Sequence, residues 1–244
     1  MNIEQLAERL VLWIRDKVLA AGCKGVVLGL SGGVDSSVTA VLCYRAFPQS
    51  TLGVIMPCYS SQQDIEHAQA VADKFSIPVR TAVLDAAFDA LLKVLLNDKA
   101  EPDVSRVAKA NIKARLRMVT LYYFANQLKY MVVGAGNRDE LSVGYFTKYG
   151  DGGVDIQPLG NLTKGQVKEL ARFLGIPQPI INKPPSAGLW EGQTDEGELG
   201  LSYDELDRYL VTGEASAEVK KRIESMIAAS EHKRQLPPVA DFEG

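Results

Sequence analysis

The chain has 244 residues, of which 46% are hydrophobic, and it carries a formal charge of −3 at pH 7 with an isoelectric point near 5.5. This length has room for one α/β domain with elaborations, which we expect over residues 1–244, or for at most two small domains. The apolar content argues against a disordered chain. The mildly acidic balance gives no reason to expect a nucleic-acid partner. The three cysteines have neither metal-ligand nor redox spacing, which favours a reducing cytoplasm.

The first predicted element is an amphipathic helix, "IEQLAERLVLWIRDKVLAA", at residues 3–21. Charges run along its whole length, so it predicts neither a signal peptide nor a membrane span. Short apolar runs of the buried-strand type then alternate with helical patterns. Strands are predicted over residues 25–30, 51–56, 79–84 and 130–136, and helices over 36–47, 61–75, 86–96 and 104–127.

This alternation predicts an open, doubly wound parallel sheet with helices on both faces, followed by C-terminal helices. If the first three strands build outward on one side, the fourth must return beside the first. Ligands bind such sheets beyond the carboxyl ends of the strands, where the strand order reverses. Segments 145–155 and 183–200 are rich in glycine or proline, and we expect them to be mobile active-site loops without regular hydrogen bonding.

The loop after the first strand contains "SGGVDSS" at residues 31–37. Its glycines let the backbone approach a ligand closely, and its serines place hydroxyls beside the amides of a helix N-terminus, which together favour anion binding. A phosphate-binding P-loop would have lysine where this loop has Asp35. Asp35 either caps the helix or holds Mg²⁺, which would bridge the carboxylate to phosphate oxygens. The loop alone leaves both interpretations open.

The loop after the fourth strand, "GAGNRDE" at residues 134–140, is expected across the same crevice. It would bring Asp139 and Glu140 opposite Asp35. Glu140 is either an ordinary acid in the first turn of a helix or a second Mg²⁺ ligand, and the geometry favours the metal slightly.

"SGGVDSS" resembles the pyrophosphatase loop of the N-type ATP pyrophosphatases, which split ATP into AMP and pyrophosphate while adenylating an acceptor. Further motifs follow in order: "NIKARLRM" at Asn111, "GAGNRDE" at Gly134, "GYFTKYGDGGVDIQPL" at Gly144, "KPPSAGLWEGQTDEGELG" at Lys183 and "SEHKRQLPP" at Ser230. Together they resemble the NAD synthetase family over nearly the whole chain. The resemblance implies an adenine nucleotide α-hydrolase-like fold, a homodimer, and a C–N ligase that uses ATP and ammonia to amidate deamido-NAD, the last step of NAD biosynthesis.

The resemblance also implies roles for individual residues. Asp35 and Glu140 would hold Mg²⁺, Lys164 would contact the phosphates, and Asp151 would receive ammonium. The implied ATP-binding residues are Gly29, Leu30, Ser31, Gly32, Gly33, Val34, Asp35, Ser36, Ala135, Lys164 and Ser186. The implied deamido-NAD-binding residues are Arg115, Lys148, Asp155, His232 and Lys233. The family often has threonine where this chain has Ala135, so only a backbone contact to ATP could remain there.

Local physical interpretations stand beside these roles. Lys164 begins a helical pattern, which is a poor place for a cation unless an anion lies nearby, so phosphate binding is favoured. Arg115 lies in a helix with several other basic residues, and such basic faces are usually solvated. His232 and Lys233 follow the last helical pattern, where the helix dipole already accounts for a cation. For these last three residues a ligand role depends on the resemblance alone.

Two other classes of function stay open. A tRNA-modifying adenylating enzyme would normally show a basic surface or thiol chemistry, which this sequence lacks. A nucleotide-binding sensor would need affinity for ATP but would release no pyrophosphate. The adenylating motifs run from about residue 29 to residue 235, so we expect no glutaminase domain and ammonia as the nitrogen source.

Overall fold

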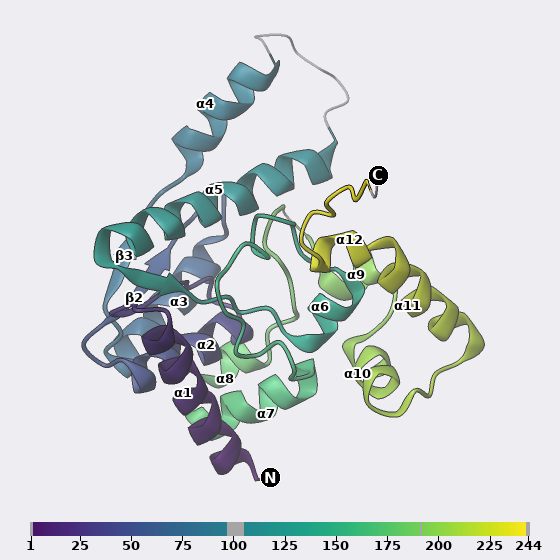
Figure 1. Ribbon diagram of the computed structural model, residues 1–244, viewed down its shortest axis with the longest axis horizontal. Helices are drawn as coiled ribbons and strands as arrows, with labels where there is room; N and C mark the ends of the chain where they lie inside the picture. The colour runs from purple at the N-terminus through teal and green to yellow at the C-terminus, as the bar shows by residue number, and fades with distance from the viewer. Residues whose placement is uncertain (1, 97–104, 191, 243–244) are drawn as a thin grey trace.

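The computed structural model describes residues 2–96, 105–190 and 192–242 (Figure 1). Its parallel sheet has the strand order β3-β2-β1-β4, so the fourth strand returns beside the first as predicted. Val26 pairs with Thr51 on one side and with Met131 on the other. The strands are β1 Gly25–Gly29, β2 Thr51–Ile55, β3 Val79–Thr81 and β4 Tyr130–Val132.

The last two strands are shorter than the apolar pattern predicts, because the regular ladder ends at Thr81 and Val132 and only single backbone hydrogen bonds continue beyond it. Beyond β4, Val133 still donates to the carbonyl of Val27 at 2.9 Å and forms an isolated bridge with Ile156. The buried segment therefore continues past the regular ladder.

The helices begin and end close to the predicted positions, although the predicted helix residue 104 lies outside the described residues. Throughout the described ranges, each helix is too short or too polar to cross a lipid bilayer. The helices are α1 Ile3–Ala20, α2 Val34–Ala46, α3 Gln62–Phe75, α4 Asp85–Leu96, α5 Arg106–Leu128, α6 Arg138–Val143, α7 Lys164–Leu174, α8 Gln178–Ile181, α9 Asp195–Leu199, α10 Tyr203–Thr212, α11 Ala217–Ala229 and α12 Glu231–Arg234.

Both faces of the sheet are covered by helices (Figure 1). Successive residues of β1 point to opposite faces, and this alternation sorts the core into two layers. Val26 and Leu28 pack with α1, α2 and α7, whereas Val27 packs with α4 and α5. Each fully buried aliphatic side chain contributes about 1.5–3 kcal/mol. The predicted doubly wound fold is confirmed.

The C-terminal helices form a third hydrophobic cluster beside the sheet. Val143 of α6, Leu206 of α10 and Ile223 of α11 are buried together with the aromatic ring of Tyr203. Helix α10 also contacts α7, which itself packs on the sheet. This packing brings the start of α10 next to the carboxyl ends of β1 and β4.

Candidate active site at the carboxyl ends of the strands

A cavity of about 500 Å³ opens at the carboxyl ends of β1, β2 and β4. It lies where the strand order reverses, which is the predicted place for a ligand in this fold. The volume lies within the usual range for small-molecule sites, roughly 300–1,000 Å³. All but one of the predicted ATP-binding residues line it: Gly29, Leu30, Ser31, Gly33, Val34, Asp35, Ser36, Ala135, Lys164 and Ser186.

The N-terminus of α2 presents uncapped amides to this cavity. Helix α2 begins after Gly33, and no side chain caps its first amides. Ser36 donates its hydroxyl proton to the carbonyl of Gly33 at 3.0 Å, and Ser37 donates to the same carbonyl at 2.8 Å. Uncapped amides at a helix N-terminus are a binding site for phosphate.

Gly32 is the one predicted ATP-binding residue that does not line the cavity, and its role is conformational. Its φ of +81° lies in the left-handed region, and a β-carbon there would overlap the backbone carbonyl oxygen of Asp64 in α3. The glycine therefore lets the loop between β1 and α2 pack directly on the backbone of α3.

We expect Gly32→Ala to lower the free energy of unfolding by about 1–3 kcal/mol, because the substitution adds both backbone strain and a backbone overlap. Gly33→Ala is the matched control: Gly33 has a φ of −85°, and its added β-carbon would meet only the Ser31 hydroxyl oxygen at 3.5 Å. Denaturant unfolding of the two variants measures the difference. Equal stability of both variants would contradict the account of Gly32.

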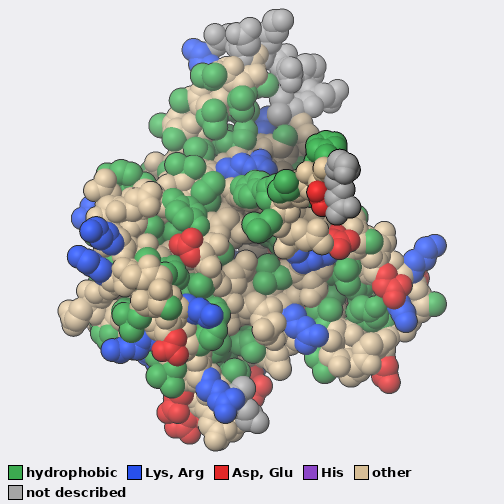
Figure 2. Space-filling view, viewed as in Figure 1, with side chains coloured by type: hydrophobic (Ala, Val, Ile, Leu, Met, Phe, Trp, Pro, Cys, Tyr) green, Lys and Arg blue, Asp and Glu red, His purple; other side chains and the backbone are tan. Residues whose placement is uncertain are grey.

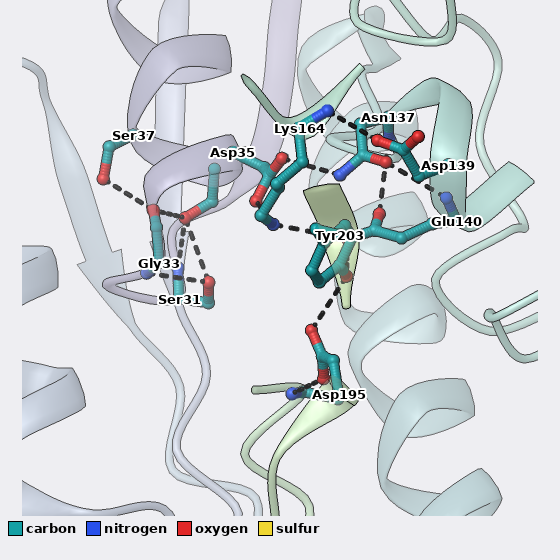
Figure 3. Close-up of polar contacts among 12 residues, drawn as sticks. Ser31, Gly33, Asp35, Ser37, Asn137, Asp139, Glu140, Lys164, Asp195 and Tyr203 are labelled. Carbon is teal, nitrogen blue, oxygen red and sulfur yellow. Dashed lines mark hydrogen bonds and ion pairs between the residues drawn. The ribbon is translucent and has the colours of Figure 1, made fainter. Parts of the chain in front are cut away.

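Asp35 does not cap α2, because its carboxylate points away from the helix toward partners from distant loops (Figure 3). One oxygen accepts from the Asn137 side-chain amide at 2.9 Å, and the other lies 2.5 Å from the Lys164 ammonium. The helix-cap interpretation of Asp35 is therefore wrong. Asn137, fully buried, is a residue that the sequence reasoning missed, although it stands in the "GAGNRDE" motif.

Glu140 is an acid in the first turn of α6, as one interpretation predicts, and its second oxygen stays available to the crevice. Its Oε2 accepts from the backbone N–H of Asn137 at 3.3 Å, which completes a capping box at the start of α6. Its Oε1 instead faces the crevice and lies 3.6 Å from the Lys164 ammonium. The loops after β1 and β4 thus bring Asp35 and Glu140 to one cation, as the strand order predicts.

The charges at this point are strongly coupled. Burial raises the pKa of Glu140 to about 8, against the lowering effect of Lys164. Burial alone would lower the pKa of Lys164, but Asp35 and Glu140 raise it above its ordinary value, so the ammonium stays charged. When Glu140 is ionised, two carboxylates face one ammonium, and the surplus negative charge would favour a further cation.

The carboxylates of Asp35 and Glu140 fit Mg²⁺. Both already contact one cation, the Lys164 ammonium, so they are close enough to share a positive charge. Among the described residues, no three His, Cys, Asp or Glu side chains are grouped as a metal site. Mg²⁺ commonly takes one or two carboxylates and completes its coordination with water and substrate phosphates. Asp35 and Glu140 would be those two carboxylates.

Asp139 does not face the crevice, contrary to the expectation from sequence. It is fully buried, and its Oδ2 accepts from the backbone N–H of Lys164 at 2.5 Å. Asp207 of α10 accepts from the next amide, that of Gly165, at 2.9 Å. The two aspartates therefore cap the N-terminus of α7 and fix the backbone from which Lys164 extends.

Two loops enclose the cavity. The glycine loop, residues 145–155, is held by tight turns in which Gly150 donates to Thr147 at 2.9 Å and Gly153 donates to Gly150 at 2.9 Å. The expectation that it lacks regular hydrogen bonding is wrong for these turns, because the amides of Gly150 and Gly153 each donate to a carbonyl three residues back. Within it, Asp151 lines the cavity and accepts from the Thr147 amide at 2.9 Å, and burial raises the pKa of this carboxyl.

The second loop, residues 183–190 and 192–195, is called the proline loop because it begins "KPP". Lys183 pairs with the carboxylate of Asp64, and both side chains line the cavity. At its other end the loop enters α9, Asp195–Leu199, so the segment predicted to lack regular structure ends in a helix. The sequence analysis gave no role to Lys183 or Asp195, although both stand in the motif "KPPSAGLWEGQTDEGELG".

The basic residues of α5 do not form one solvated face. Arg115 is exposed as expected, but Lys113 and Arg117, four residues apart, point inward. Lys113 donates to the carbonyl of Leu189 in the proline loop at 2.9 Å, and Arg117 donates to the carbonyl of Met56 at 3.1 Å. Arg117 lines the cavity and was missed, because burial cannot be read from a run of alternating basic residues.

The predicted deamido-NAD residues are only partly brought together. Lys233 lines the cavity, but the other four do not. Arg115, Lys148 and His232 form a chain of contacts outside it: Arg115 donates to the Lys148 carbonyl at 3.3 Å, and the Lys148 ammonium donates to the His232 carbonyl. Asp155 lies apart and accepts from Tyr122 and from the backbone of β4.

Comparison with known proteins assigns the family. The model of the NAD synthase family matches residues 6–237. A protein of Carboxydothermus hydrogenoformans named NH(3)-dependent NAD(+) synthetase is 52% identical over 240 residues, 98% of each chain.

Solved structures agree with this relationship. NMN synthetase from Francisella tularensis is 38% identical with a TM-score of 0.94, and the match covers 99% of this chain and 100% of that one. NH3-dependent NAD synthetase from Campylobacter jejuni is 26% identical with a TM-score of 0.81, over 99% and 100% of the two chains. With its motifs, its fold and these relatives in agreement, the chain belongs to the NAD synthase family.

Proposed function

We propose that this chain is an ammonia-dependent NAD synthetase of the cytoplasm, a ligase that converts deamido-NAD, ATP and ammonia to NAD, AMP and pyrophosphate. The observation that carries the proposal is the meeting of Asp35, Glu140 and Lys164 beside the uncapped N-terminus of α2. Membership of the NAD synthase family and the names of the relatives support the same activity.

The reaction needs activation of a carboxylate, because a free carboxylate offers ammonia only oxide or hydroxide as a leaving group. The nicotinate carboxylate would attack the α-phosphorus of ATP in line, forming a C–O–P linkage and expelling pyrophosphate. Loop amides at the start of α2 and the Lys164 ammonium would bind the phosphates and neutralise the charge that builds on them. Mg²⁺ held by Asp35 and Glu140 would supply further charge neutralisation on the phosphate oxygens.

Amide formation follows when ammonia attacks the acyl carbon and AMP leaves. Asp151 would bind ammonium and accept its surplus proton, since its carboxylate lines the cavity and its pKa is raised by burial. The glycine and proline loops would exclude water from the mixed anhydride, which water otherwise hydrolyses.

We further propose a homodimer that completes the dinucleotide site. Arg115, Lys148 and His232 lie outside the cavity, so a dinucleotide would have to extend beyond it to meet them. Hydrophobic side chains gather over α4 and α5 (Figure 2). Val119 and Tyr123 of α5 are exposed. Exposed apolar surface of this kind suits a subunit contact.

A second candidate is amidation of the corresponding mononucleotide. The F. tularensis NMN synthetase has a TM-score of 0.94, against 0.81 for the C. jejuni NAD synthetase. The cavity also meets only one of the five residues assigned to the dinucleotide. Both candidates share the same adenylation chemistry and differ in the size of the nicotinate nucleotide.

Substrate preference separates the candidates. With Mg²⁺, ATP and an ammonium salt in excess, we expect kcat/KM for deamido-NAD to exceed that for nicotinate mononucleotide by tenfold or more, about 1.4 kcal/mol of transition-state binding. The measurement follows AMP and pyrophosphate together with the amide product, which is NAD from deamido-NAD and nicotinamide mononucleotide from nicotinate mononucleotide. The opposite preference would establish the mononucleotide as substrate, and ATP binding without pyrophosphate release would indicate a nucleotide sensor.

A further inference from the structure

Tyr203 contacts the proposed metal site from α10, a helix that contains none of the residues predicted for that site. It is the first residue of α10, yet its hydroxyl lies 3.4 Å from Oε1 of Glu140 and 3.1 Å from Oδ2 of Asp195 (Figure 3). The side chain is 3% exposed, and the Lys164 ammonium lies 4.9 Å from the centre of its ring. Burial and the flanking carboxylates raise the pKa of the phenol, so it stays protonated.

Asp195 is the point where both loops are fastened. It is 4% exposed and accepts from the backbone N–H of Ala187, within the proline loop, at 3.0 Å. The hydroxyl of Tyr145, in the glycine loop, lies 3.1 Å from the same carboxylate and shares its proton between Asp195 and Glu198, which lies 2.5 Å away. Because the Asp195 carboxylate contacts both the proline loop and the glycine loop, it holds both loops over the cavity.

The hydroxyl of Tyr203 has one proton and faces two carboxylates. It can donate to Asp195 or to Glu140, but not fully to both at once. A cation bound to Oε1 of Glu140 would replace the hydrogen bond from Tyr203 to Glu140. The Tyr203 hydroxyl proton would then be donated to Asp195 alone. The hydrogen bond to Asp195 would then strengthen, since one donor no longer serves two acceptors.

We propose that Tyr203 is a positioning residue that couples cation binding at Glu140 to the docking of the proline loop through Asp195. The proposal rests on the proposed function only in placing Mg²⁺ at Asp35 and Glu140. Its consequence is that the cavity closes over ATP when the cation is present, before the water-sensitive intermediate forms.

The test is hydrogen exchange of residues 184–190 with ATP present, in Mg²⁺ and again in excess EDTA. In the unaltered chain, exchange should be slower with Mg²⁺ than with EDTA. In Tyr203→Phe we expect this Mg²⁺-dependent slowing to shrink about fivefold or more, the usual lower range of coupling between sites. Mn²⁺ affinity with ATP, measured by electron paramagnetic resonance, should fall by a similar factor.

Two tyrosine variants control for simple loss of packing. Tyr209→Phe removes a hydroxyl from the same helix that bonds only to Glu224, and it should change neither quantity. Tyr145→Phe removes the hydroxyl that contacts Asp195 and Glu198 but does not contact Glu140, so it should speed exchange equally in Mg²⁺ and in EDTA.

The outcomes are distinct. Unchanged Mg²⁺-dependent slowing in a folded Tyr203→Phe variant would overturn the coupling while leaving the amidation activity standing. If that variant does not fold, Glu140→Gln tests the link from its other end, and Mg²⁺-dependent slowing that persists there would equally overturn it. Failure of the proposed function would show separately, as absence of NAD formation by the unaltered chain.

Discussion

Asp35→Asn should reduce kcat for NAD synthesis by about 10²–10³-fold, and Glu140→Gln should do the same, while both variants remain folded. Each substitution removes one of the two charges that meet at the Lys164 ammonium. The fold should survive, because in either variant Lys164 keeps one carboxylate partner and is not left buried and unpaired. The loss should therefore be in the handling of the phosphates and not in the core.

The matched control is Glu198→Gln. Glu198 also lines the cavity, but it accepts from Tyr145 at 2.5 Å and from Gln193 at 2.8 Å instead of facing Lys164. Its loss should cost less than the loss of either metal-site acid. Initial rates over a range of Mg²⁺ concentrations, with thermal unfolding of each variant, make the comparison. Near-normal turnover of Asp35→Asn or Glu140→Gln at saturating Mg²⁺ would show that the substituted residue does not hold the metal.

The strand order and the meeting of two loops could be predicted from the sequence, because both follow from local patterns and a topological rule. Apolar runs mark β1 and β4, and a fourth parallel strand that returns beside the first must bring the loops of Asp35 and Glu140 together. No side-chain detail is needed for that step. It depends only on which ends of the strands share an edge.

Side-chain direction could not be predicted with the same rules. Asp139 and Glu140 are neighbours at the start of α6, but successive helical residues point about 100° apart, so only Glu140 faces the crevice while Asp139 turns to the amide of Lys164. Tyr203 and Asp195 were missed for another reason. They reach the site through the packing of α9 and α10 on α6, and nothing in their local sequence records that contact.

The motif resemblance assigned roles to residues without placing them. It put Arg115, Lys148, Asp155, His232 and Lys233 in one substrate-binding set, but the structure leaves all but Lys233 outside the cavity. A role inferred from a motif carries no information on which groups act within one chain. The proposed homodimer would complete the dinucleotide site around these four residues. A mononucleotide substrate would not need to reach them.

The nitrogen source should be ammonia. The chain should make NAD, AMP and pyrophosphate from deamido-NAD, ATP and an ammonium salt, and should make no NAD above background from ammonia-free glutamine. Release of ammonia from glutamine needs an activated nucleophile with a base beside it. Burial raises the pKa of the Cys43 and Cys58 thiols, which opposes the thiolate form. The chain has only two histidines, His67 and His232, to act as a base.

The rate with ammonium salts should rise with pH, because ammonium must lose a proton before nitrogen can attack the acyl carbon, and should level off when another group titrates.

Asp151→Asn should raise KM for ammonium with little change in KM for ATP, since Asp151 lines the cavity but belongs to neither the phosphate loop nor the metal site. Coupled measurement of NAD and pyrophosphate checks both statements. Efficient synthesis from ammonia-free glutamine by this chain alone would refute the assignment of ammonia, and an unchanged KM for ammonium in Asp151→Asn would move the ammonium site elsewhere in the cavity.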